Sequence, residues 1–331
     1  MNLIKNFSRQ FIYPLITAVG AEHLLSAMCK SKKLILVYHG VVEQPNHDVA
    51  MGPISVKQLD EHFAYFKKHF DVVSLSEMFE MYRNNVEPER KTIAITFDDG
   101  YENNYTHAYS LLKKYSFPAT MYVITSCIEN ENMITWYDYI DFVKQDLQLE
   151  KIDVSAFNRE PVISVDELKE FIKTLNISKR EKLYIEIAKQ VNIENYIPKF
   201  PKEFWKLMNK KQLKELADSG LVEIAPHSHT HPNLGQIELA EAKIEIEKSK
   251  KKLEETIQQQ VKSFGFPDGN YTDDVKRICL EAGYKNLLAA DYRCASDLND
   301  KSILPRLCVS STTTTDANMI LIHQHFAEFS F

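Results

Sequence analysis

The chain of 331 residues lacks paired cysteines, an excess of positive charge and long hydrophobic runs. Its five cysteines are scattered without a Cys-x-x-Cys pair, which argues against a disulfide framework or a zinc finger and favours reduced thiols. The net charge of −6 disfavours a nucleic-acid binder, because such proteins need a positive surface. We expect a globular, cytoplasmic protein; a secreted or envelope-associated location is the alternative.

The first 33 residues are the one part of the chain that resembles a targeting segment. Basic residues precede an apolar run at 11–19, as in a signal peptide. Pro14 interrupts this run and Glu22 follows it closely, and the run is far shorter than the roughly 20 residues that span a bilayer. We predict an N-terminal helix over residues 1–33 that lies on the fold and no transmembrane span. A cleaved signal, or peripheral membrane contact through this helix, is the alternative.

Two adjacent carboxylates end a predicted strand at Thr92–Phe97. Neighbouring strand residues point to opposite faces, so Asp98 and Asp99 serve one site only if the backbone turns there, which Gly100 permits. Adjacent carboxylates repel each other unless a cation or a proton lies between them. The pattern therefore predicts a metal site or two Asp residues with different tasks. A simple turn that ends the strand is the alternative.

Three histidines follow another predicted strand at 221–225. His227 and His231 are spaced i, i+4, so both rings can face one point, as in many zinc sites, whereas His229 points elsewhere. With one carboxylate of Asp98–Asp99 they would give three protein ligands and one open position. That is the catalytic type of metal site, and the other Asp is then free to take a proton from water.

Two further histidines follow predicted strands. His323 comes after the apolar residues 319–322 and could protonate a leaving group. His325, two residues later, would lie on the same face of the strand, so the pattern alone does not choose between them. His39 follows the predicted strand 34–38 and is either a substrate contact, a support for the site or a polar rim residue.

Arg306 is a cation inside the otherwise apolar predicted strand 303–309. A buried arginine needs a carboxylate partner, and Asp98 is the candidate. Such a pair would lower the pKa of Asp98 and fix its orientation. An edge-strand arginine that points to solvent is the alternative.

About eight predicted strands alternate with helices, which favours an α/β fold, a closed or nearly closed (β/α) barrel. The polar clusters follow strand ends, and in such barrels this is the active-site face. The rhythm breaks at about 137–219, where we predict a mostly helical insertion within the barrel domain 34–331. The insertion either shapes a substrate cleft or decorates the scaffold. Trp136 at its start is either a core anchor or a border of the site.

The motifs resemble those of polysaccharide deacetylases of the NodB homology type, carbohydrate esterase family 4. The two most specific segments are Thr-Phe-Asp-Asp-Gly at 96–100 and His-Ser-His-Thr-His-Pro at 227–232. Weaker support comes from Phe-Gly-Phe-Pro-Asp-Gly at 264–269 and Leu-Ile-His at 321–323. The resemblance covers roughly residues 34–326 outside the insertion and implies a distorted (β/α) barrel.

The resemblance also implies roles for individual residues. A divalent metal, usually Zn²⁺, would be bound by Asp99, His227 and His231. Asp98 would be the general base, with Arg306 as its partner, and His323 the general acid. The main-chain N–H of Asp268 would hold the oxyanion, and the substrate would contact His39, Pro267 and Leu321.

Two positions depart from the family pattern. Gly265 stands where the family often has an arginine that orients the catalytic Asp, a loss that Arg306 could offset. Asp268 stands where an aromatic residue is usual. The resemblance implies a metal-dependent hydrolase that removes acetyl groups from N-acetylated sugars of a polysaccharide or cell-surface glycan. The alternatives are a non-catalytic glycan-binding relative that keeps the metal, and a deacylase of lipid-linked or O-acetylated glycans.

Overall fold

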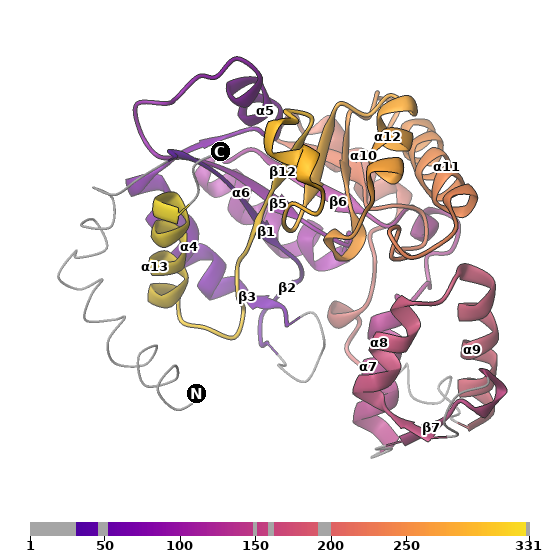
Figure 1. Ribbon diagram of the computed structural model, residues 1–331. Coiled ribbons are helices and arrows are strands. Elements are labelled where there is room, and N and C mark those ends of the chain that lie inside the picture. Colours follow the sequence, from indigo (N-terminus) through magenta and orange to yellow (C-terminus); the bar gives the residue numbers. More distant parts are fainter. Residues whose placement is uncertain (1–30, 46–51, 148–150, 158–161, 191–199, 329–331) are drawn as a thin grey trace.

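The computed structural model describes residues 31–45, 52–147, 151–157, 162–190 and 200–328 (Figure 1). The predicted N-terminal helix, apart from residues 31–33, lies outside these ranges. Among the helices of the described ranges, none combines the length and the apolar character needed to cross a membrane.

The main sheet has six strands, and all of its pairings are parallel. Its central strands are almost wholly buried, which is why they read as continuous apolar runs rather than alternating ones. The order is β13-β1-β5-β6-β9, and β4 pairs with the first half of β5. The bounds are β1 Lys33–Tyr38, β4 Asp71–Val73, β5 Thr92–Phe97, β6 Ala119–Val123, β9 Val222–Pro226 and β13 Leu307–Cys308.

A second parallel sheet completes the ring. It contains β10 (Ser263–Gly265), β11 (Asn286–Ala289) and β12 (Ile303–Pro305), and β10 lies beside β9. Strands β12 and β13 are separated only by Arg306, so the last strand leaves one sheet and enters the other. The predicted α/β fold with a parallel sheet is confirmed, and the barrel is distorted because β9 and β10 belong to separate sheets.

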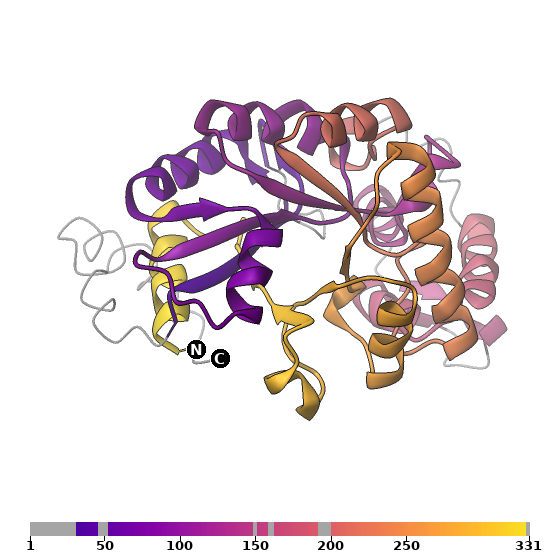
Figure 2. The ribbon, with the colours of Figure 1, turned by 90° about the horizontal axis from the view of Figure 1, so that it is seen from above.

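Helices cover the outside of this ring (Figure 2). Ser55 caps the first of them by accepting a hydrogen bond from the Gln58 N–H at 3.0 Å. Ser74 caps the second. The bounds are α4 Val56–His69, α5 Leu75–Arg83, α6 Tyr109–Tyr115, α10 Lys210–Asp218, α11 Leu239–Ile257 and α12 Asp273–Glu281. Two short strands that follow β1 in the chain, β2 (Val41–Val42) and β3 (Ile54–Ser55), pair with each other.

The predicted strand at 319–323 is wrong, because these residues belong to helix α13 (Thr315–Glu328). The Thr314 hydroxyl accepts a hydrogen bond from the Ala317 N–H at 3.2 Å and starts the helix. A run of four apolar residues fits a buried helix as well as a strand, and here the helix packs against α4 and β1.

The segment between β6 and β9 forms a lobe at the side of the barrel (Figure 1). It consists of α7 (Trp136–Leu147), the antiparallel pair β7 (Lys151–Asp153) and β8 (Val162–Ser164), α8 (Val165–Lys173) and α9 (Ile177–Gln190). Helix α10, which we expected to be part of the insertion, packs instead against β9 and α11 as a barrel helix.

Candidate functional site

The turn after β5 places its two carboxylates in different directions. The Asp98 N–H donates to the Tyr38 carbonyl at 2.9 Å, which joins the ends of β5 and β1. Asp99 then adopts φ +73° and Gly100 φ +79°, both left-handed. A Cβ on Gly100 would lie 2.8 Å from Cγ1 of Val123, so only glycine fits, as the sequence predicts.

Asp98 faces Arg306. The guanidinium Nη1 and Nη2 donate to the two Asp98 carboxylate oxygens at 2.7 Å each, and both side chains are buried. Burial opposes ionisation of Asp98, but the charge and hydrogen bonds of Arg306, together with the nearby histidines, outweigh it and lower the pKa to about 2. The structure therefore forms the predicted pair and holds Asp98 as an oriented carboxylate.

Gly265 shows why this cation comes from a different strand than in the family pattern. A Cβ on Gly265 would lie 2.9 Å from Cδ1 of Tyr122 and 3.2 Å from Nδ1 of His227, so no larger residue fits here. The Arg306 guanidinium instead lies over the Tyr122 ring, 5.4 Å from its centroid. Arg306, which lies between β12 and β13, thus provides the cation beside Asp98.

Asp99 faces the two histidines that the sequence pairs with it. Its Oδ1 lies 3.5 Å from His231 Nε2 and 3.8 Å from His227 Nε2. One possible ligand atom from each of the three buried residues lies within 4.8 Å of the others. The His227 Nδ1 is 2.8 Å from the Gly265 carbonyl, which places the proton on Nδ1 and leaves the Nε2 lone pair for the cluster.

The chemistry of this cluster fits a divalent cation. Burial lowers the pKa of His227 to about 4 and that of His231 to about 3, so both rings are neutral, as metal ligands must be. Burial, together with the charge of Asp98, raises the pKa of Asp99, an unfavourable state that a cation would relieve. Among the described residues, Oδ2 of Asp99 has no hydrogen-bond partner.

The histidine loop is held by Glu245 and Arg180, which the sequence did not point to, and by Trp136, which it placed either in the core or at the border of the site. The buried Glu245 of α11 accepts hydrogen bonds from the N–H groups of His229 and Thr230, each at 2.8 Å, and from the Thr230 hydroxyl. From the insertion, Arg180 Nη1 and the Trp136 indole N–H donate to the His231 carbonyl at 3.1 and 3.2 Å. The sequence did contain a signal for Glu245, because it is a charged residue on the buried face of α11. It lies next to Ile246 and in line with the buried Ala242, Ser249 and Leu253.

Other predicted site residues lie around this centre. His229 points away, with its Nδ1 3.0 Å from the Thr125 hydroxyl, as expected. His39 follows β1 beside β5, and burial lowers its pKa overall, although the nearby charge of Asp98 opposes this shift. Pro267 is buried, whereas the Asp268 side chain is exposed at a left-handed φ of +53°. The Asp268 charge acts on Asp99 and His231, which places it near the cluster.

His323 and Leu321 do not belong to the site, so their predicted roles are corrected. His323 Nε2 is 2.9 Å from the Tyr65 hydroxyl and its Nδ1 3.0 Å from Lys91 Nζ. Lys91 precedes the six-residue strand β5, whereas Asp98 follows it, a separation of about 20 Å. Leu321 lies on the same helix α13, which Figure 2 shows on the side of the molecule opposite the insertion.

Comparisons with known proteins agree with this architecture. A family model described as polysaccharide deacetylase matches residues 85–287. A poly-beta-1,6-N-acetyl-D-glucosamine N-deacetylase of Staphylococcus aureus is 22% identical over 265 residues, which are 78% of this chain and 68% of the relative.

Solved structures show the same fold. The Streptococcus pyogenes deacetylase PplD, determined in complex with acetate, superimposes with a TM-score of 0.57 at 20% identity and covers 87% of this chain and 96% of its own. IcaB from Ammonifex degensii superimposes with a TM-score of 0.57 at 16% identity over 88% of this chain and 97% of its own.

Proposed function

Because the chain belongs to the polysaccharide deacetylase family, we propose that it is a metal-dependent hydrolase that removes acetyl groups from N-acetylated sugars of a cell-surface glycan. The observation that supports this most strongly is the buried Asp98–Arg306 pair beside the Asp99–His227–His231 cluster. It combines an ionised base with a three-ligand set. The name of the Staphylococcus aureus relative suggests poly-β-1,6-N-acetyl-D-glucosamine as the substrate class.

Asp99, His227 and His231 would hold the cation. Two imidazoles and one carboxylate are a common ligand set of catalytic zinc, which makes Zn²⁺ the ion we propose. When bound, such an ion supplies Lewis-acid polarisation of a carbonyl and makes water more acidic.

Asp98 is the proposed general base. One of its oxygens lies 3.6 Å from His227 Nε2, so the carboxylate flanks the cluster and can take the proton of a water that attacks the acetyl carbonyl. Arg306 keeps Asp98 ionised and oriented at the same time. The missing arginine at Gly265 therefore no longer favours the non-catalytic alternative.

An amide also needs a proton on its departing nitrogen. With His323 on the other side of the barrel, the group that we propose for this step is His39, which follows β1 and feels the charges of Asp98 and Arg306. Burial lowers the pKa of His39 overall, and the negative charge of Asp98 only partly offsets this, so the ring would gain the proton that it donates in the course of the reaction. The main-chain N–H of Asp268, beside the cluster, is the proposed partner of the developing oxyanion.

The test couples metal analysis to acetate release from a panel of N-acetylated and O-acetylated sugars and oligomers. We expect Asp98→Asn to lose turnover by at least about 10³-fold and to keep its metal, because Asp98 acts on water rather than on the ion. His231→Ala should lose the metal, whereas His229→Ala in the same loop should keep it.

Three outcomes would contradict the proposal in different ways. Full activity of metal-free Asp98→Asn protein would exclude the mechanism. Retention of glycan without acetate release would identify a binding protein. Acetate release from O-acetylated sugars alone would show that the protein hydrolyses esters rather than amides.

A further inference from the structure

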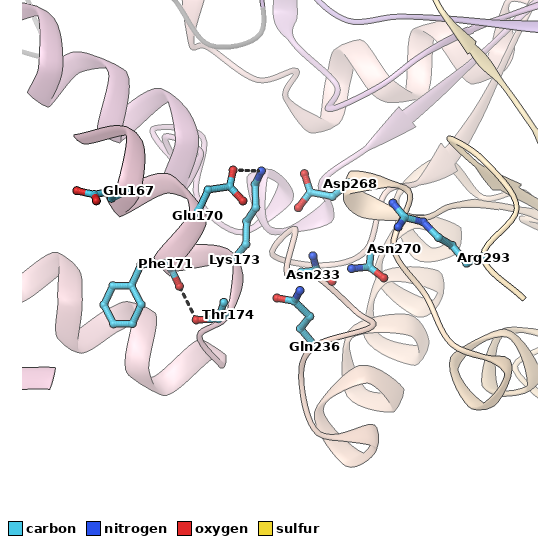
Figure 3. A pocket seen from close by; sticks show the side chains of 10 residues that line it. All are labelled: Glu167, Glu170, Phe171, Lys173, Thr174, Asn233, Gln236, Asp268, Asn270 and Arg293. Carbon is cyan, nitrogen blue, oxygen red and sulfur yellow. Dashed lines mark hydrogen bonds and ion pairs between the residues drawn. The ribbon is translucent and has the colours of Figure 1, made fainter. Parts of the chain in front are cut away.

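A cavity of about 740 Å³ lies between helix α8 of the insertion and the loops that follow β9 and β10 (Figure 3). Its volume is in the range of roughly 300–1,000 Å³ typical of small-molecule sites. Glu170 and Lys173 line it from α8, and Asn233, Gln236 and Asn270 line it from the barrel loops. We call this cavity the insertion cleft.

The barrel side of the insertion cleft offers three amide groups beside one acidic and one basic residue, Asp268 and Arg293, whose charges are opposite. Asn233 is only 4% exposed, and among the described residues its Oδ1 accepts no hydrogen bond. A buried carbonyl oxygen without a donor is costly, and a hydroxyl or N–H of a bound molecule would satisfy it. Gln236 and Asn270 add donors and acceptors on the same side (Figure 3).

The α8 side suits a neutral ligand. Glu170 and Lys173 form an ion pair at 2.9 Å, so their charges compensate each other while their remaining polar atoms are available to hydroxyls. The Phe171 ring is almost fully buried and points away from the barrel loops, so this side offers polar atoms rather than an apolar face (Figure 3). The hydroxyl and amide groups of an N-acetylated sugar can pair with these donors and acceptors.

The insertion cleft lies next to the residues that we propose bind the metal. Asn233 follows His231 by two residues, and Asp268 lines the cleft while its charge acts on Asp99. Arg180 Nε donates to the carbonyls of Ile172 and Leu175 at the end of α8, each at 3.2 Å. Because Nη1 of the same side chain donates to the His231 carbonyl, one buried arginine joins α8 to the histidine loop.

We propose that the insertion cleft binds neutral N-acetylated sugars of the same chain, adjacent to the sugar that is deacetylated. This inference rests on the proposed function for the identity of the glycan. It assigns the insertion a role in recognition: the protein acts on oligomers in preference to monosaccharides, and the α8 side contributes to that preference.

The experiment measures binding without turnover, by calorimetry on metal-loaded Asp98→Asn protein. The probes are N-acetyl-D-glucosamine and its β-1,6-linked trimer and pentamer. We expect the pentamer to bind at least about tenfold more tightly than the monosaccharide. The double change Glu170→Ala/Lys173→Ala, and Gln236→Ala on the opposite side, should each weaken pentamer binding by about three- to tenfold and leave monosaccharide binding unchanged.

The insertion itself provides a matched control. Glu186 and Lys189 of α9 form an i, i+3 pair at 2.6 Å away from the cleft, so Glu186→Ala/Lys189→Ala removes the same charges and should bind the pentamer like the parent. Equal affinity for all chain lengths, or equal effects of the two double changes, would overturn the inference. Acetate release by the wild-type protein is measured separately, so a failure of the proposed activity remains distinguishable from a failure of the cleft.

Discussion

Arg306 both supplies a charge that keeps Asp98 ionised and holds the Asp98 carboxylate in position, and replacements of Arg306 can separate these two effects. Removing one member of a buried ion pair leaves the other uncompensated, typically at a cost of about 3–5 kcal/mol. We expect Arg306→Met to lower the free energy of unfolding by a similar amount and kcat by at least about 100-fold, because Asp98 loses both its charge partner and its position.

The matched change Arg306→Lys keeps the charge without the two parallel hydrogen bonds. It should recover most of the stability but only part of kcat. Denaturant unfolding and steady-state acetate release measure the two quantities. A folded Arg306→Met protein with wild-type kcat would contradict a positioning role.

At the scale of single residues, the sequence predicted a contact where a charged residue in apolar surroundings has another charged side chain as its partner. Arg306 in an apolar strand required a carboxylate, and the structure supplies Asp98. Glu245 and Arg180 carry the same kind of signal, but their partners are main-chain groups of a loop, which leave no trace in residue types. His323 was misplaced because four apolar residues do not distinguish a strand end from a buried helix.

Among the elements, helix α11 controls the histidine loop through Glu245. In Glu245→Gln one acceptor oxygen becomes a donor, so at least one of the three loop hydrogen bonds is lost. We expect metal affinity to fall by about 10–100-fold, the usual cost of losing a group that orients ligands. Competition with a chromophoric chelator measures this. The exposed Glu247→Gln on the same helix should leave affinity unchanged, and an equal loss there would refute the assignment.

Helix α12 is tied to the segment Ala295–Asn299 by a buried carboxylate, and this contact should depend on pH. Burial opposes ionisation of Asp297, but hydrogen bonds from Lys276 and Tyr271 outweigh it and lower its pKa. A lowered pKa contributes stability that is fully present above the ordinary value of about 3.9 and is lost as the pH falls through the lower folded value.

Asp297→Asn should therefore lower the free energy of unfolding by about 1–3 kcal/mol between pH 5 and 8. The difference from the wild type should shrink below about pH 4. Urea unfolding at several pH values measures it. Asp274→Asn, which removes an exposed pair with Arg277, should change stability by less than about 1 kcal/mol. A constant difference at all pH values would exclude ionisation as the cause.

For the whole molecule, the cation should act as a stabilising ligand. Binding to the folded state alone adds about 2.7 kcal/mol at a free metal concentration of 100 Kd. We expect Zn²⁺ to raise the Tm of the wild-type protein and of His229→Ala, and to leave the Tm of Asp99→Asn and His231→Ala nearly unchanged, because only the latter two lose a ligand. Differential scanning calorimetry provides the measurement. A similar shift in all four proteins would place the ion elsewhere.

The overall architecture was predictable to the extent that it depends on local patterns. Apolar runs that end in polar residues located strands β1, β5 and β9, and their parallel order follows from the intervening helices. The seam between β9 and β10 was not predictable, because it depends on which main-chain groups meet after folding. The position of the insertion beside the histidine loop depends on hydrogen bonds between segments far apart in sequence, such as Arg180 with His231.

The junction of β12 and β13 has a consequence for biosynthesis. Asp98 is made early, whereas the guanidinium that neutralises it is more than 200 residues downstream. A nascent chain that has emerged from the ribosome only as far as β11 carries Asp98, Asp99, His227 and His231 but not the arginine that pairs with Asp98. Assembly of the buried cluster is therefore complete only when the final strand joins the two sheets.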